Sequence, residues 1–204
     1  MARIFSSTGV KTTIVEREPR LAPMLDVELS DALAKTFKRE KVDVRTGVEV
    51  KEIQFSDEGA SLVLAGGETI NAAAVLLSVG RVPDESALGG LDLEREGRAI
   101  RVDGSMRTSI PGLYAPGDVN AQNMLAHAAF KMGEVAAQDA MGHMEHAAAS
   151  DPVELLKYTP GVIYGEPEAA CVGLTESQAK EQYGEIRVGR FPFQANGRAI
   201  ASGQ

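Results

Sequence analysis

Thr108–Asp118, with the sequence TSIPGLYAPGD, is the stretch that decides how we interpret the fold of this chain. The apolar run Gly112–Ala115 predicts a short strand that ends at Pro116 and Gly117 and delivers the carboxylate of Asp118. Ligands of α/β sheets bind beyond the carboxyl ends of the strands. An ionised carboxylate can only accept hydrogen bonds, so it suits a sugar or polyol hydroxyl. The stretch therefore predicts a ligand-facing corner of an α/β sheet.

A helical pattern follows this corner, and its first residues carry a resemblance to a known family. The segments IPGLYAPGDV and MLAH resemble the second flavin-contacting segment of the pyridine nucleotide–disulfide oxidoreductases, and they are most similar to the dihydrolipoamide dehydrogenases. The resemblance implies that Asp118 holds the ribitol side of FAD. It also implies that the backbone of Met124, Leu125, Ala126 and His127 runs along the flavin. We expect that helix to extend to about residue 143.

The first 45 residues predict part of a dinucleotide-binding βαβ unit. The run Lys11–Glu16 is apolar, β-branched and ends in an acid, which is typical of a buried strand. We expect Asp26 to cap a helix over Val27–Lys41, and a second strand over Val42–Arg45. An acid at the end of such a strand accepts hydrogen bonds from the adenosine ribose and repels a 2′-phosphate. On spacing alone Glu16 reads better as a solvent-facing glutamate, but the resemblance favours an NAD contact.

Residues 48–74 alternate between apolar and polar side chains and predict an antiparallel meander. The resemblance implies that Val48 touches the adenine ring of NAD, while a buried strand valine is the plain alternative. The apolar run Val75–Val79 predicts a central strand. It ends at the segment GRVP, where the resemblance implies that Gly80 lies against the nicotinamide half of NAD. A tight turn at Gly80 is compatible with that role.

The last fifty residues begin a new unit. We expect strands over Thr159–Tyr164, Ala169–Gly173 and Ile186–Phe193, and a helix from Thr175 with a capping box that pairs it with Gln178. This pattern resembles the first half of the α+β interface domain that builds the homodimer in the family.

The predicted fold class is therefore α/β, with three parts. Residues 1–82 form an incomplete Rossmann-like NAD domain, 83–150 the C-terminal part of an FAD domain, and 151–204 the start of the interface domain. The glycine fingerprint G-x-G-x-x-G is absent from the sequence. We therefore expect an internal part of a longer protein that by itself binds NAD weakly, because those glycines hold the pyrophosphate.

Composition excludes several classes of function. The net charge of −8 and a pI near 5.0 argue against nucleic acid and anionic membranes as partners. Cys171 is the only cysteine, so no internal disulfide can form, and a small buried apolar side chain is the expected role. His143 and His146, without further ligands, are weak evidence for a metal, so we expect no metal site. No export signal is visible, which makes the cytoplasm the expected compartment.

The resemblance implies oxidation of dihydrolipoamide by NAD⁺ through FAD, a C-x₄-C disulfide and a His–Glu pair. The sequence holds neither the disulfide nor the pair, so we assign no catalytic residue and expect this chain alone to be inactive. A homodimer and a lipoyl-bearing 2-oxo acid dehydrogenase complex are the implied partners. Mercuric reductase or another flavin disulfide reductase is an alternative family member, and a non-catalytic nucleotide-binding remnant is an alternative of another class.

Overall fold

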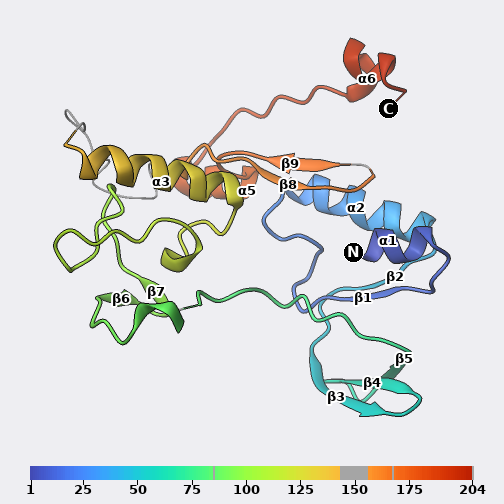
Figure 1. Ribbon diagram of the computed structural model, residues 1–204. Coiled ribbons are helices and arrows are strands. Elements are labelled where there is room, and N and C mark those ends of the chain that lie inside the picture. Colours follow the sequence, from blue (N-terminus) through green and yellow to red (C-terminus); the bar gives the residue numbers. More distant parts are fainter. Residues whose placement is uncertain (85, 143–155, 167, 204) are drawn as a thin grey trace.

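The structure is a computed structural model that describes residues 1–84, 86–142, 156–166 and 168–203. Figure 1 shows its short helices and small sheets in chain order. They are α1 (Ala2–Ser7), β1 (Thr13–Val15), α2 (Val27–Arg39), β2 (Asp43–Arg45), β3 (Val50–Ser56), β4 (Gly59–Leu64), β5 (Thr69–Ala72), η1 (Ser86–Leu88), β6 (Arg95–Glu96), β7 (Ala99–Ile100), η2 (Asp118–Asn120), α3 (Ala126–Ala140), β8 (Gly161–Ile163), β9 (Ala169–Cys171), α5 (Glu176–Tyr183), η3 (Phe193–Ala195) and α6 (Gly197–Ala201).

The N-terminal unit is a parallel strand pair joined by a helix, as the sequence predicts. β1 pairs with β2 in parallel, with Thr13 opposite Asp43, and α2 forms the connection. Helix α1 ends in a Schellman motif, because Val10 N–H bonds to the carbonyl of Phe5 while Gly9 takes a left-handed φ of 85°. A residue without a Cβ adopts that conformation at little cost, which explains the glycine.

The predicted meander is confirmed as β3, β4 and β5, an antiparallel sheet in that spatial order. In Figure 1 this sheet lies below the rest of the chain. A long extended segment leads from it to the hairpin of β6 and β7.

A hydrophobic core lies between the β6–β7 hairpin, the loop before η2 and the inner face of α3. Met106 and Met132 are fully buried at its centre. Its other buried members are Leu93, Ile100, Val102, Ala115, Ala128, Ala136 and Leu156. This core fixes the start of α3 relative to the corner at Gly117 and Asp118.

The C-terminal hairpin of β8 and β9 packs on α2 rather than on a neighbour in sequence. Leu25, Leu33 and Ala169 form a second buried cluster, and Ile163 and Cys171 pack against it. Figure 1 shows the hairpin beside α2 and places α6 at the end of an extended stretch that leaves α5. Cys171 is half-buried, which agrees with a packing role.

Asp26 lies at the N-cap of α2, but its side chain does not cap that helix. Asp26 Oδ1 instead accepts a hydrogen bond of 2.7 Å from the N–H of Glu176, the first residue of α5. The predicted capping box of α5 is confirmed, with Thr175 and Gln178 bonded reciprocally. One carboxylate thus ties the starts of two helices together, 150 residues apart in the chain.

Two predicted strands are wrong. Val75–Val79 has no strand pairing, and Ile186–Phe193 has none either and runs into η3 at Phe193. Within the described residues, neither segment belongs to a sheet, and β1 and β2 pair only with each other. Apolar composition alone does not make a strand, because a strand requires a hydrogen-bonded partner. The strand over Gly112–Ala115 is likewise reduced to a single bridge between Arg107 and Tyr114.

Candidate functional site

The corner at Gly117 and Asp118 has the geometry that its sequence predicts. Gly117 is buried with φ 88° and ψ −157°, a combination that is essentially restricted to glycine. Its N–H donates to Met132 Sδ at 3.1 Å, so the turn is anchored on the inner face of α3. Asp118 follows at the start of η2, and its carboxylate is exposed. Beneath it, Asn120 is fully buried and donates to the carbonyl of Ala115 at 2.9 Å.

The start of α3 presents unsatisfied backbone donors beside this corner. Leu125 is the N-cap residue and provides no side-chain cap, so the first N–H groups of the helix have no acceptor among the described residues. Met124 and Leu125 are half-buried, whereas Ala126 and His127 are exposed. His127 Nε2–H donates to the carbonyl of Pro160 at 2.7 Å, which joins α3 to the chain just before β8.

A buried carboxylate holds the far end of α3 to the corner's own loop. Asp139 accepts from Arg107 Nε at 2.6 Å and Nη2 at 2.9 Å, and from the hydroxyl of Tyr114 at 2.7 Å. The Asp139 side chain is 5% exposed and that of Arg107 57%. The hydrogen bond from Tyr114, then that from Arg107, holds the pKa of the Asp139 carboxyl below its ordinary value, against the effect of burial.

We expect this network to make stability depend on pH in the acid range. A carboxyl whose pKa is lower in the folded state stabilises the fold above its unfolded pKa, and the contribution is lost as pH falls through the folded pKa. The loss therefore begins below about pH 4, near the ordinary pKa of aspartate. Urea unfolding from pH 7 to pH 3 should show a steeper fall for the wild type than for Asp139→Asn. Parallel curves would contradict the prediction, and Asp31→Asn, at an exposed position on α2, is the control.

Glu16 and Val48, the two residues predicted for the adenosine end of NAD, lie together. Val48 N–H donates to the carbonyl of Glu16 at 3.0 Å, just past the ends of β1 and β2. Glu16 Oε1 accepts from the N–H of Glu18 at 2.9 Å, and both side chains are half-buried. The second carboxylate oxygen of Glu16 has no partner among the described residues, so it is available to a hydroxyl.

Gly80 lies in the exposed segment that connects the meander to the β6–β7 hairpin. Its φ is 121°, and no atom lies within 4 Å of the position that a Cβ would take. Its neighbour Arg81 reaches the segment before α3, because Arg81 Nη2 donates to the carbonyl of Met124. This bond joins the residue that follows Gly80, which is predicted for NAD, to Met124, which is predicted for FAD.

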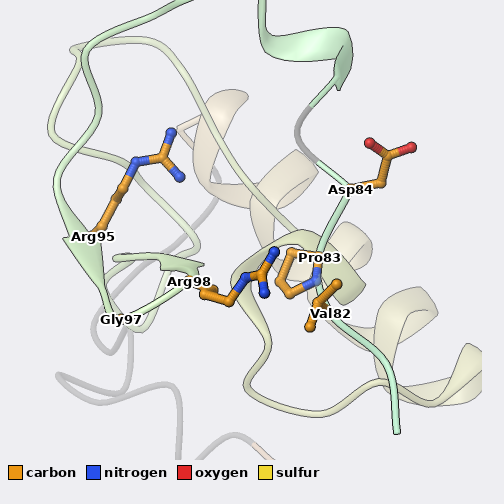
Figure 2. Close-up of a pocket in the computed structure, with 6 residues that line it drawn as sticks. All are labelled: Val82, Pro83, Asp84, Arg95, Gly97 and Arg98. Atoms are coloured by element: carbon orange, nitrogen blue, oxygen red, sulfur yellow. The ribbon is translucent and has the colours of Figure 1, made fainter.

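A hollow of about 560 Å³ lies between that connecting segment and the β6–β7 hairpin. Figure 2 shows Arg98 reaching from the hairpin toward Val82 and Pro83. Arg95, Asp84 and Gly97 complete the lining. None of the residues predicted for FAD or NAD lines it, so we do not place either cofactor there.

No group of His, Cys, Asp or Glu in the described part of the chain has the arrangement of a metal site. Among the helices of the described ranges, none combines the length and the apolar character needed to cross a membrane.

Comparison with known families agrees with this geometry. The sequence model described as "Pyridine nucleotide-disulphide oxidoreductase" matches residues 1–133, which include the corner and the start of α3. This chain belongs to that family. The model of the family's dimerisation domain matches residues 159–204. The resemblance found in the sequence is thereby confirmed, as is the mixed α/β fold class.

Family relatives match over the whole chain. It is 36% identical to a dihydrolipoyl dehydrogenase of Chlorobaculum tepidum over 210 residues, which covers 100% of this chain and 44% of the relative. A dihydrolipoyl dehydrogenase of Bacillus subtilis is 34% identical, and the match covers 43% of it. The chain thus spans less than half the length of these curated relatives.

Solved structures share the fold. The crystal structure of LpdA from Mycobacterium tuberculosis superposes with a TM-score of 0.85 at 25% identity, over 99% of this chain and 43% of that one. The HOCl-induced flavoprotein disulfide reductase RclA from Escherichia coli gives a TM-score of 0.83 at 22% identity, over 98% and 46%.

The residues at the corner fit a flavin nucleotide. Flavin offers carbonyl and ring-nitrogen acceptors, which match the uncapped N–H groups of α3, and its ribitol offers hydroxyls, which match the acceptor-only Asp118. The glycine at position 117 lets the backbone approach closely. The sequence pattern around GRVP assigns no role to Arg81. Its partner Met124 is 43 residues away, and no local pattern indicates that contact.

Proposed function

We propose that this chain is part of an FAD- and NAD-dependent dithiol oxidoreductase similar to dihydrolipoyl dehydrogenase. The reaction would be dihydrolipoamide + NAD⁺ → lipoamide + NADH + H⁺. The observation that carries the proposal is the juxtaposition of Asp118 with the uncapped start of α3, in a chain whose full length matches relatives of that name. FAD held at this corner would supply the two-electron redox chemistry between the dithiol and NAD⁺.

Each predicted cofactor residue takes a separate part in this proposal. Asp118 accepts from ribitol hydroxyls, and the backbone from Met124 to His127 lies along the flavin and supplies its N–H donors. Glu16 accepts from the adenosine ribose and disfavours a 2′-phosphate, while Val48 packs against the adenine. Gly80 leaves room for the nicotinamide. The chain positions both cofactors, and we assign no catalytic residue to it.

The arrangement into parts follows the same proposal. Residues 1–82 would belong to the NAD domain, 83–150 to the FAD domain and 151–204 to the interface domain of a homodimer. The match of residues 159–204 to the dimerisation domain supports the homodimer. Association with a lipoyl-bearing 2-oxo acid dehydrogenase complex and a cytoplasmic location stay predictions.

The test compares two purified proteins: the full product of the gene and the 204-residue chain. We expect the full product to reduce NAD⁺ with dihydrolipoamide, and the 204-residue chain to show no such turnover, since its sequence has one cysteine and no redox pair. In the full product, Glu16→Gln should raise the KM for NAD⁺ about tenfold with little change in kcat, because it removes ribose binding.

Other outcomes point elsewhere. Turnover of a different disulfide or of a metal ion in place of dihydrolipoamide would assign the protein to another flavin disulfide reductase. A full product without bound flavin would overturn the proposal. Turnover by the 204-residue chain alone would contradict the expected inactivity.

A further inference from the structure

Arg81 makes a contact that neither the predicted cofactor roles nor the packing of the core requires. Its side chain is exposed on the connecting segment, yet Nη2 donates to the backbone carbonyl of Met124, directly before the N-cap of α3. A guanidinium is always charged and presents donors only. The bond therefore places a fixed positive charge beside the segment predicted to face the flavin.

The direction of this bond sets the direction of the next peptide N–H. A trans peptide is planar, and its C=O and N–H point in opposite directions. When Arg81 holds the carbonyl of Met124, the N–H of Leu125 must point away from Arg81. Leu125 has extended backbone angles, φ −120° and ψ 138°, and its N–H has no acceptor in the described ranges.

The helix that follows adds donors to the same place. The N–H groups of Ala126, His127 and Ala128 precede the first intrahelical bond, which runs from Ala129 N–H to the carbonyl of Leu125. Four successive donors at the positive end of a 15-residue helix thus have no acceptor in the part of the chain that the structure describes, and the first of them is oriented by Arg81.

We propose that Arg81 is a positioning residue for the flavin, and this rests on the function proposed above. Arg81 orients the Met124–Leu125 peptide so that its N–H faces the flavin together with the first donors of α3. The positive charge of the Arg81 guanidinium, held beside the carbonyl of Met124, also favours the electron-rich reduced flavin over the oxidised form. Because Arg81 directly follows Gly80, it links the segment predicted for nicotinamide to the segment predicted for flavin.

The experiment measures FAD affinity, the visible circular dichroism of the bound flavin and its reduction potential in the full gene product. Arg81→Met removes both the donor and the charge. Arg81→Lys keeps the charge and one donor, which suffices because a single nitrogen makes the bond. The matched control is Arg20→Met, because Arg20 also donates to backbone carbonyls, those of Pro23 and Leu25, in a loop before α2.

We expect Arg81→Met to weaken FAD binding about tenfold, the size produced by losing one charge-assisted hydrogen bond. Its flavin dichroism should change, and its potential should shift to a more negative value. Arg81→Lys should restore most of the affinity and the potential, and Arg20→Met should leave flavin affinity, dichroism and potential at wild-type values.

Two results would overturn the inference while leaving the proposed function intact. One is that the wild type binds FAD and Arg81→Met is indistinguishable from the wild type. The other is equal loss of flavin in Arg81→Met and Arg20→Met, which would indicate general destabilisation. A wild type that binds no FAD would remove the proposed function and the inference together.

Discussion

Replacing Gly117 by valine is expected to abolish flavin binding and to lower the free energy of unfolding by about 1–3 kcal/mol. The cause is the backbone, since φ 88° with ψ −157° is strained for any residue that has a Cβ. A Cβ here would also lie 3.4 Å from the Cβ of Ala129, so the branches of valine would press on α3. Any shift of the turn would break the bond to Met132 and displace Asp118.

Gly133→Ala is the matched control for this substitution. Gly133 lies in the same helix, α3, its φ is not positive, and nothing lies within 4 Å of its Cβ position. Alanine there should stabilise the helix by about 0.5–1 kcal/mol. Urea unfolding and flavin titration of the full gene product measure both changes. A Gly117→Val protein that retains flavin at wild-type affinity would show that the corner does not hold the cofactor.

Leu25→Ala is expected to destabilise the chain by about 2–5 kcal/mol. Leu25 is 1% exposed and lies in the cluster with Leu33 and Ala169, so truncation leaves a cavity between α2 and the β8–β9 hairpin. The neighbouring Met24 is 62% exposed, and Met24→Ala should have little effect. Urea unfolding of both variants provides the comparison. Equal stability of the two proteins would mean that the hairpin does not depend on α2.

Features determined by neighbouring residues could be predicted from the sequence. The capping box at Thr175 and the glycine turn at Gly117 each depend on a few consecutive residues, and both are present. The segments Val75–Val79 and Ile186–Phe193 have strand composition, but strand formation depends on a partner elsewhere in the chain. No partner lies beside them within the described residues.

In the candidate site, too, features set by neighbouring residues could be predicted, whereas contacts between distant segments could not. The exposed position of Asp118 could be predicted because it directly follows the glycine turn at Gly117. Glu16 and Val48 are each assigned through the resemblance, and the parallel pairing of β1 with β2 brings them together. Two contacts could not be predicted. One is the bond from Arg81 to Met124, and the other is the bond from the start of α5 to the side chain of Asp26, which does not cap its own helix. Each is a single polar contact between distant segments, and neither leaves a periodic signal.

The packing of the β8–β9 hairpin on α2 has a consequence for synthesis on the ribosome. Helix α2 is complete at Arg39, but the strands that cover its apolar face end at Cys171, about 130 residues later. At ordinary elongation rates this face waits on the order of 10 seconds for its cover. During that interval Leu25 and Leu33 are available to a chaperone or to another nascent chain. Slower translation between these two points would lengthen the exposure and favour aggregation of the unfinished protein.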